Sequence, residues 1–270
     1  MKQTLAATLL VLTLLNVPGH ALAVRDDLGR PVSLPQAAQR IVTLSPHGTE
    51  LVLAAGAGQR LVGVATGSRL PADLDALPRI SAHGGLDREA LLALQPDLVV
   101  AWQSGNRATD LDWIAATDTP LYRSEPASIQ DIARTLRDIG ILSGTAATAE
   151  SAARTFELAF QTPCRQLPPQ AAYVLIWERP AMTVGGRHWI NAVLQAAGYR
   201  NVLAHLDRGV FAIAPEAAFA YSNLTRISLN RSFDHGAADD LADLLSRPGP
   251  RLGEAVRLLC TRRLRQPPSD

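Results

Sequence analysis

This chain of 270 residues has few aromatic residues, and it lacks both a basic tract before its C-terminal tail and a long apolar run after its N-terminus. Aromatic residues make up only 5% of the chain, so each of the four Trp stands out. The 26 basic and 25 acidic residues nearly balance, and no basic tract precedes the C-terminal tail, which argues against a nucleic-acid-binding surface. After the first 23 residues, no apolar run is long enough to span a membrane.

The motifs of common hydrolases and zinc proteins are also missing. The chain contains no G-x-S-x-G nucleophile elbow, and Ser45 and His47 lie only two positions apart, which does not make a catalytic triad. Cys164 and Cys260 are too far apart in the sequence for the paired ligand spacing of a structural zinc site. The residues therefore provide no catalytic constellation.

The N-terminus carries the pattern of an export signal. Lys2 supplies the positive charge, residues 5–17 form an apolar run, and Ala21-Leu22-Ala23 matches an A-x-A cleavage site. The pattern predicts a signal peptide over residues 1–23, cleaved after Ala23, and a soluble, exported mature protein. A buried N-terminal helix is the alternative.

An even number of cysteines in an exported protein favours a disulfide. A bridge between Cys164 and Cys260 would close a loop of roughly 100 residues and stabilise the fold by about 4–5 kcal/mol on the chain-entropy model. Two buried free thiols remain the alternative.

Strands and helices alternate along the chain, which predicts an α/β fold with parallel sheets. The first half contains expected strands at residues 41–44, 61–64, 79–81, 98–101 and 120–122, separated by helical patterns at 51–55, 88–94, 110–116 and 129–142. The second half repeats this style, with strands at 172–177 and 225–229 and helices at 188–197, 215–221 and 252–264. An Ala-rich helix at 148–160 lies between the halves and suits a connector.

One buried strand delivers an aromatic residue to the edge of its sheet. The apolar run 98–101 is bounded by Pro96-Asp97 and by Ser104-Gly105-Asn106, as expected of a strand covered on both faces. Ligands of open α/β sheets bind at the carboxyl ends of the strands, where Trp102 stands. Trp177 ends a strand of the second half in the same way. Two facing aromatics would suit a large flat ligand, and ordinary packing is the alternative.

Two further groups of residues have both a functional and an ordinary explanation. His47, His83 and His188 each adjoin a glycine-containing turn, so they could converge on a metal site, although a loop histidine is usually just solvated. A secreted metal-dependent enzyme is the hypothesis that follows from such a site. Glu89 and Glu216 begin helices in corresponding parts of the two halves, where the helix dipole alone would favour them.

The chain resembles the vitamin B12-binding periplasmic proteins of ABC importers, which belong to the helical-backbone (class III) metal-chelate substrate-binding proteins. The resemblance runs in order from about Arg40 to Cys260. The motifs that carry it are Thr43-Leu44-Ser45-Pro46, Thr49-Glu50-Leu51, Pro96-Asp97-Leu98-Val99-Val100-Ala101-Trp102 with Gly105-Asn106, Ile176-Trp177-Glu178-Arg179-Pro180, Met182-Thr183-Val184, Arg187-His188 and Ser246-Arg247-Pro248-Gly249-Pro250-Arg251-Leu252.

The resemblance implies two Rossmann-like lobes with parallel sheets, joined by a single long helix, with the ligand in the cleft between them. The expected divisions are an N-terminal lobe at 24–144, a connecting helix at 145–163, a C-terminal lobe at 164–264 and a disordered tail at 265–270. The implied function is the capture of a corrinoid, cobalamin, in the periplasm and its delivery to an ABC permease dimer. The protein is then expected to be a monomer, without a cofactor and without enzyme activity.

The resemblance also implies roles for particular residues. Trp102 would pack on the corrinoid, and residues 243–247 would be the contacting loop of the second lobe. The expected ligand-binding set is Pro46, His47, Gly67, His83, Trp102, Trp177, Asp243, Leu244, Leu245, Ser246 and Arg247. Glu89 and Glu216 match the glutamates, one per lobe, that form salt bridges with arginines of the permease.

The chain departs from the family pattern at several positions. Gly67 stands where the family has a cleft Tyr, and His83 replaces a second cleft Trp. One family Cys falls at Ala197, so Cys164 would serve as the alternative partner of Cys260. The second lobe is also short, because residues 230–242 replace a helix and a strand. The lost aromatics leave haem or a ferric siderophore as alternative ligands of the same fold.

Overall fold

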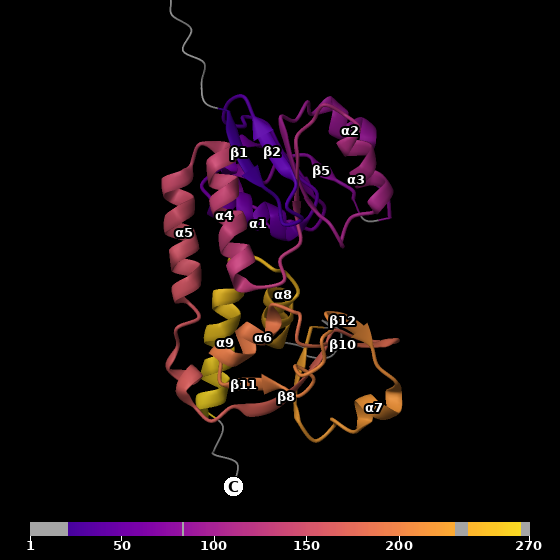
Figure 1. Ribbon diagram of the computed structural model, residues 1–270, viewed down its shortest axis with the longest axis vertical. Coiled ribbons are helices and arrows are strands. Elements are labelled where there is room, and N and C mark those ends of the chain that lie inside the picture. The colour runs from indigo at the N-terminus through magenta and orange to yellow at the C-terminus, as the bar shows by residue number, and fades with distance from the viewer. Residues whose placement is uncertain (1–20, 83, 230–236, 266–270) are drawn as a thin grey trace, which may run out of the picture.

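The computed structural model of the protein describes residues 21–82, 84–229 and 237–265. Most of the predicted signal peptide, His83, residues 230–236 and the predicted tail from 266 onward lie outside these ranges. The described residues form two α/β lobes stacked along the long axis, with two helices along one side (Figure 1). None of the described helices is long and apolar enough to cross a membrane.

The N-terminal lobe is built on a five-stranded parallel sheet. Its strand order is β5-β4-β3-β6-β7, with bounds β3 Ile41–Thr43, β4 Leu61–Ala65, β5 Arg79–Ile80, β6 Leu98–Trp102 and β7 Leu121–Ser124. All registers between neighbours are parallel, as the alternating pattern predicts. The carboxyl ends of the strands therefore meet at one edge of the sheet.

Helices cover both faces of this sheet. They are α1 Pro46–Ala54, α2 Arg88–Ala93, α3 Ala108–Ala115 and α4 Ile129–Ser143, with 3-10 turns η1 Gly58–Arg60 and η2 Ala72–Leu74. Alternate residues of β6 enter two different cores: Leu98 and Val100 pack in the core shared with α1 and α4, and Val99 and Ala101 pack in the core shared with α2 and α3. Burial on both faces explains why this strand is a continuous apolar run.

An N-terminal hairpin precedes the sheet, and the sequence pattern did not predict it. Its strands β1 Leu22–Arg25 and β2 Pro31–Leu34 pair in antiparallel fashion, with Leu22 opposite Leu34. The turn residue Asp27 accepts a hydrogen bond from the Glu125 amide and pairs with Arg134 of α4 at 2.8 Å. The strand includes Leu22 and Ala23, which the predicted cleavage would remove.

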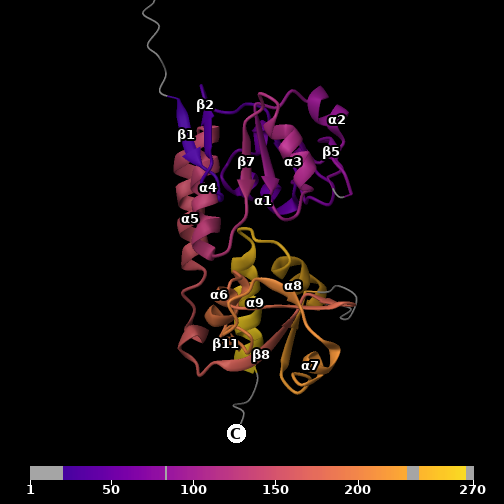
Figure 2. The same ribbon diagram turned by 45° about the vertical axis from the view of Figure 1, so that its right-hand side comes forward.

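The connector between the lobes is α5, Ala146–Leu158, which begins two residues before the predicted helix. It runs back along α4, and Figures 1 and 2 show the pair on one side of the molecule. The two helices approach closely at Gly140, where an added Cβ would lie 2.2 Å from the Ala149 Cβ. Arg137 joins them further by ion pairs to Glu150 at 2.6 Å and to Glu157 at 2.9 Å.

The C-terminal lobe contains two small sheets. The parallel sheet has the order β11-β8-β13, with β8 Gln170–Leu175, β11 Tyr199–Asn201 and β13 Thr225–Ser228. The antiparallel sheet has the order β12-β10-β9, with β9 Trp177–Glu178, β10 Ala181–Val184 and β12 Val210–Ala212. The helical segments are η3 Pro163–Gln166, α6 Ile190–Ala196, α7 Pro215–Phe219, α8 Ala237–Leu245 and α9 Leu252–Arg265.

Several predicted elements need correction. The helix α1 begins at Pro46 rather than at residue 51, because Ser45 caps it by accepting a hydrogen bond from the Gly48 amide. Residues 243–245 lie on α8 rather than in a loop. The strands β11 and β12 were not predicted, because each has only three residues, too few for an apolar pattern to stand out.

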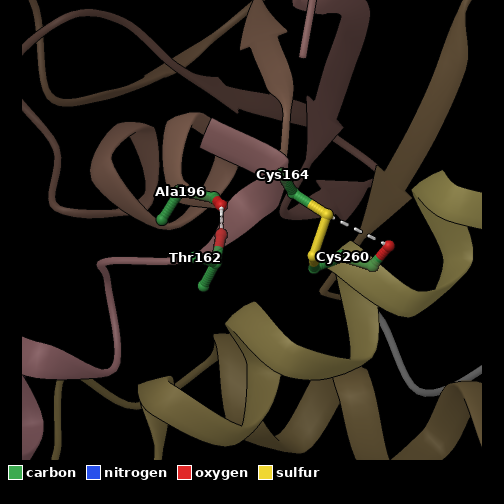
Figure 3. Close-up of a disulfide and its surroundings, with 4 residues drawn as sticks. All are labelled: Thr162, Cys164, Ala196 and Cys260. Carbon is green, nitrogen blue, oxygen red and sulfur yellow. Dashed lines mark hydrogen bonds between the residues drawn. A yellow bond between two sulfur atoms is a disulfide. The ribbon is translucent and has the colours of Figure 1, made fainter. Parts of the chain in front are cut away.

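A disulfide joins the two ends of the C-terminal lobe. Cys164 of η3 is bonded to Cys260 of α9, with a Cα–Cα distance of 5.7 Å and a sequence separation of 96 residues (Figure 3). Beside it, the Thr162 hydroxyl donates a hydrogen bond to the Ala196 carbonyl. The predicted bridge is therefore confirmed, and the free-thiol alternative is wrong.

Candidate functional site

The first part of the candidate site lies at the carboxyl end of β6. Asn106 holds the turn there, because its side chain accepts from the Trp102 amide at 2.8 Å and donates to the Leu44 carbonyl at 2.9 Å. Gly105 is required by close approach, since an added Cβ would lie 1.9 Å from the Trp102 ring. The Gly105-Asn106 pair thus fixes the half-buried Trp102 ring at the carboxyl edge of the sheet.

His47 lies beside Trp102, in the first turn of α1. The two rings meet edge to face, with centroids 5.0 Å apart and an interplanar angle of 87°. Burial, with a smaller contribution from the nearby Arg247 guanidinium, lowers the pKa of His47 to about 3. Its buried Nε2 atom has no hydrogen-bond partner among the described residues. The imidazole is therefore neutral at physiological pH.

A chain of buried hydroxyl groups fixes the start of α1 to the sheet. The Thr49 hydroxyl lies 2.7 Å from that of Thr43 and 2.8 Å from that of Ser68. It also donates to the Ser45 carbonyl at 3.2 Å. These contacts join β3, α1 and the loop after β4.

An ion-pair cluster connects the two lobes at the same place; we call Glu50, Arg69, Asp243, Arg247 and Arg251 the interlobe cluster. The Arg247 guanidinium lies 3.0 Å from the Glu50 carboxylate and 3.2 Å from that of Asp243. Asp243 also pairs with Arg69 at 3.0 Å and with Arg251 at 3.2 Å. Both acids are almost fully buried, with Glu50 7% and Asp243 2% exposed.

The chemistry of this cluster depends on its burial. Burial raises the pKa of Glu50 above its ordinary value, although the hydrogen bond and the charge of Arg247 oppose the shift. Gly249 permits the close approach of the lobes, because an added Cβ would lie 3.0 Å from a Glu50 carboxylate oxygen. Figure 1 shows the segment between α8 and α9 reaching up to the N-terminal lobe. Sequence reasoning missed the role of Glu50 and Arg251, although both stand in the motifs of the resemblance.

The structure brings several of the predicted ligand-binding residues to this junction. Arg247 also reaches the Gly67 carbonyl at 3.4 Å, and Gly67 adopts a φ of 82°, which favours glycine. Pro46 occupies the first turn of α1 next to His47. The junction thus unites residues from β6, α1, the loop after β4 and the end of α8.

Other predicted residues lie elsewhere. Leu244 and Leu245 pack in the core, because α8 turns its apolar face inward, and the Ser246 hydroxyl bonds the Asp243 carbonyl. Trp177 is 52% exposed on β9, and its indole N–H donates to the Arg179 carbonyl. No described contact joins its ring to Trp102. His83 lies outside the described residues.

The predicted convergence of histidines has no support in the described part of the chain. His188 accepts a hydrogen bond from the Ile190 amide and packs against Trp189 in the C-terminal lobe. Burial lowers its pKa to about 4. The described residues contain no group of three or more His, Cys, Asp or Glu side chains placed to hold a metal ion.

The two glutamates predicted to dock a permease lie on short helices, one in each lobe. Glu89 is in the first turn of α2, and Glu216 is in the first turn of α7. Both are exposed. Figure 1 places the two helices on the same side of the long axis.

Curated relatives are vitamin B12-binding proteins. The chain is 32% identical to the vitamin B12-binding protein of Vibrio parahaemolyticus over 170 residues, which cover 62% of each chain. It is 31% identical to that of Yersinia pestis over 202 residues, which cover 74% of this chain and 66% of the relative. The chain thus spans less than two thirds of the length of these relatives.

Solved structures share the fold over most of the chain. The periplasmic vitamin B12-binding protein BtuF of Vibrio cholerae superposes with a TM-score of 0.71 and 25% identity, covering 85% of this chain and 99% of that one. A periplasmic haem-binding protein from Pseudomonas aeruginosa has a TM-score of 0.69 and 23% identity, covering 83% and 92%. At that identity, the second likeness supports the fold alone.

The family comparison agrees with the two-lobed architecture. The family described as periplasmic binding protein matches residues 41–256, from the start of β3 into α9. This range contains both parallel sheets, the connector and the interlobe cluster. The chain therefore belongs to the periplasmic binding protein family.

Proposed function

We propose that this protein is the substrate-binding protein of an ABC importer and that it captures a corrinoid, cobalamin, between its lobes. The observation that carries the proposal is the Trp102 ring, held by Gly105 and Asn106 at the carboxyl end of β6 and beside the interlobe junction. The names of the Vibrio and Yersinia relatives and the likeness to BtuF support the choice of ligand.

The proposed binding surface combines one flat and one polar region. Trp102 supplies the flat face for the corrin ring, and Trp177 supplies a second aromatic surface from β9. Of the predicted contacts, His47 packs against Trp102, Pro46 precedes it on α1, and Gly67 contacts Arg247, while Asp243, Ser246 and Arg247 belong to the other lobe. Corrinoids carry peripheral amides, which hydrogen-bond to charged and polar side chains of this kind. Because the interlobe cluster occupies Asp243 and Arg247, ligand entry would have to exchange some of its pairs.

Haem or a ferric siderophore is the second candidate ligand. The specific observation in its favour is His47, a neutral imidazole with an unpartnered Nε2 beside the Trp102 ring. A neutral imidazole is a common ligand of iron. The loss of a family aromatic at Gly67 also weakens the case for the corrin ring alone.

The remaining parts of the proposal concern export and transport. The protein would be exported to the periplasm after cleavage behind Ala23, which leaves Val24 and Arg25 to pair with β2. We propose lobes at 24–144 and 164–264 around a connector at 145–163. The protein would act as a monomer and deliver its ligand chemically unchanged, and Glu89 and Glu216 would meet arginines of the permease dimer.

Calorimetric titration of the purified protein with cyanocobalamin, and separately with haem, tests the proposed ligand. We expect saturable binding of cyanocobalamin, and Trp102→Ala should weaken it about tenfold or more because an aromatic contact surface is lost. Trp113→Ala is the matched control, since Trp113 lies on α3, where its ring packs under the Arg88 guanidinium of α2. Saturation with haem and no heat with cyanocobalamin would overturn the choice of ligand.

A further inference from the structure

Each of the two short helices α2 and α7 carries a similar pair of exposed residues, an acid and a large apolar residue three positions later. On α2, Glu89 is followed three positions later by Leu92, and on α7, Glu216 is followed three positions later by Phe219. Residues three apart lie on the same face of a helix. Each helix therefore presents one carboxylate beside one large apolar side chain.

Both members of each pair are open to solvent. Leu92 is 54% exposed and Phe219 is 76% exposed, and both glutamates are exposed as well. Neither glutamate forms an ion pair with another described residue. In contrast, the neighbouring Arg88 is engaged, because it pairs with Asp110 at 3.1 Å and lies over the Trp113 ring. The free groups on these helices are thus the carboxylate and the apolar side chain.

The helix dipole does not account for the whole pattern. It favours an acid in the first turn, but it gives no reason for an exposed Leu or Phe one turn later. A single exposed apolar side chain is ordinary on a protein surface. The observation that points to an interaction surface is the repetition of the same acid-to-apolar spacing on one short helix of each lobe. The two helices also sit in differently built lobes, one on a five-stranded and one on a three-stranded parallel sheet, so the repeated pair is not a by-product of one local fold.

The two pairs are placed to act together. Figures 1 and 2 show α2 and α7 on the same side of the molecule in both views, one in each lobe, and α5 on the opposite side. Two similar pairs on one side match a partner with two equivalent halves. An ABC permease dimer has this symmetry, and the charge of the pairs requires a basic group in each half.

We propose that Leu92 and Phe219 are the apolar anchors of a two-part docking surface, and that each inserts into a recess beside the basic residue that binds Glu89 or Glu216. The occupant is the permease dimer, so this inference rests on the proposed function. The ion pairs would set orientation and the rate of association, whereas the buried Leu and Phe would slow dissociation.

Binding to the purified permease–ATPase complex of the same organism, reconstituted in nanodiscs, tests this proposal. The variants are Leu92→Ser, Phe219→Ser and their combination, next to the charge reversals Glu89→Lys and Glu216→Lys. We expect each apolar variant to raise the dissociation constant about tenfold and the double variant about a hundredfold. The slope of affinity against salt should persist in the apolar variants and fall in the charge reversals.

Leu158→Ser is the matched control, because Leu158 is 68% exposed and belongs to α5, which lies on the opposite side of the molecule from α2 and α7 (Figures 1 and 2). Its docking should equal that of the unmodified protein, and calorimetry with cyanocobalamin should give the same affinity for all variants. If the Leu92 and Phe219 double variant docks normally while the charge reversals do not, the proposed role of the apolar residues is wrong and that of the glutamates stands. Normal docking of the charge reversals would sink the proposed glutamate contacts. An equal loss in Leu158→Ser would also overturn the anchors.

Discussion

Both lobes are built on a parallel sheet covered by helices, but the two sheets differ in size. The N-terminal lobe has five parallel strands, and its sheet separates two apolar cores. The described C-terminal lobe has three parallel strands and a separate antiparallel sheet of three short strands. A cavity of about 350 Å³ remains between β8 and α7, lined in part by Tyr173 and Tyr221. The C-terminal lobe thus has the smaller parallel sheet, with an unfilled cavity beside it.

The difference indicates where the smaller lobe obtains its stability. Small domains with limited cores depend on cross-links and on neighbouring domains. The C-terminal lobe has both: the Cys164–Cys260 bridge closes it upon itself, and the interlobe cluster ties its α8 and α9 to the N-terminal lobe. The N-terminal lobe contains no cysteine. The comparison therefore predicts that the two lobes respond unequally to the loss of these connections.

Removal of the disulfide should give the largest effect. The double variant Cys164→Ser and Cys260→Ser frees a loop of 96 residues, which the chain-entropy model values at about 4–5 kcal/mol. We expect the loss to concentrate in the C-terminal lobe. Hydrogen exchange followed by mass spectrometry measures this, because peptides from β8 should exchange much faster while peptides from β6 keep their protection.

The oxidised and reduced forms of the unmodified protein supply the control. Reduction should reproduce the effect of the double variant and should leave the double variant itself unchanged. An equal loss of protection in β6 and β8 would show that the lobes unfold as one unit and would contradict the comparison.

Removal of one acid from the interlobe cluster should give the next largest effect. Glu50→Gln leaves the buried Arg247 with one carboxylate in place of two, and breaking a buried ion pair typically costs about 3 kcal/mol. We expect denaturant unfolding to split into two transitions, because the C-terminal lobe loses its support from α1. Intrinsic fluorescence and circular dichroism recorded against urea would detect the separation.

Glu150→Gln is the matched control for this change. Glu150 also pairs with two arginines, Arg137 and Arg154, but all three side chains are partly or largely exposed on the α4–α5 pair. Exposed ion pairs contribute less than about 1 kcal/mol. A single transition in Glu50→Gln, shifted no further than in Glu150→Gln, would show that the cluster does not couple the lobes.

The sequence predicted the parts of the fold that local pattern determines. The run 98–101 identified a doubly buried strand, and the α/β alternation of the first lobe followed from apolar runs and turn residues. The disulfide was predictable from an even cysteine count in an exported chain, although the distance between Cys164 and Cys260 was not. The position of Trp102 at the carboxyl end of β6 was also predicted, and its contact with a ligand stays a prediction.

Other features of the fold could not be predicted from the sequence, because they depend on contacts between distant segments. The β1–β2 hairpin overlaps the signal-peptide pattern, and only its docking on α4 through Asp27 and Arg134 distinguishes it. The interlobe cluster joins Glu50 to Arg247 across 197 positions, and no periodicity encodes such a pair. The motifs of the resemblance contained both residues, but the pattern alone could not show that they meet.

Acid should give the smallest of the three effects, through His47. Burial holds the pKa of His47 at about 3 in the folded protein, against about 6.5 in an unfolded chain. Between these values the unfolded chain binds the extra proton, so stability falls as the pH is lowered from 6.5 toward 3. Linkage predicts a loss of about 2 kcal/mol between pH 7.5 and pH 5. His47→Gln should lack this contribution, which denaturant unfolding at the two pH values would measure.

Subtracting the pH dependence of stability in His47→Gln from that in the unmodified protein leaves the contribution of His47 alone. Burial raises the pKa of Asp138 to about 6, which opposes the histidine effect in both proteins and cancels in the comparison. The Arg247 guanidinium is near enough to His47 to lower its pKa, and Arg247 is itself held by Glu50, so the same pair of profiles in a Glu50→Gln background tests which lobe buries the imidazole. If the effect disappears there, the C-terminal lobe supplies the burial through the segment around Gly249, whose added Cβ would lie 3.9 Å from the His47 Cβ. If the effect persists, the N-terminal lobe buries His47 by itself, so its greater independence from the other lobe extends to the carboxyl edge of its sheet.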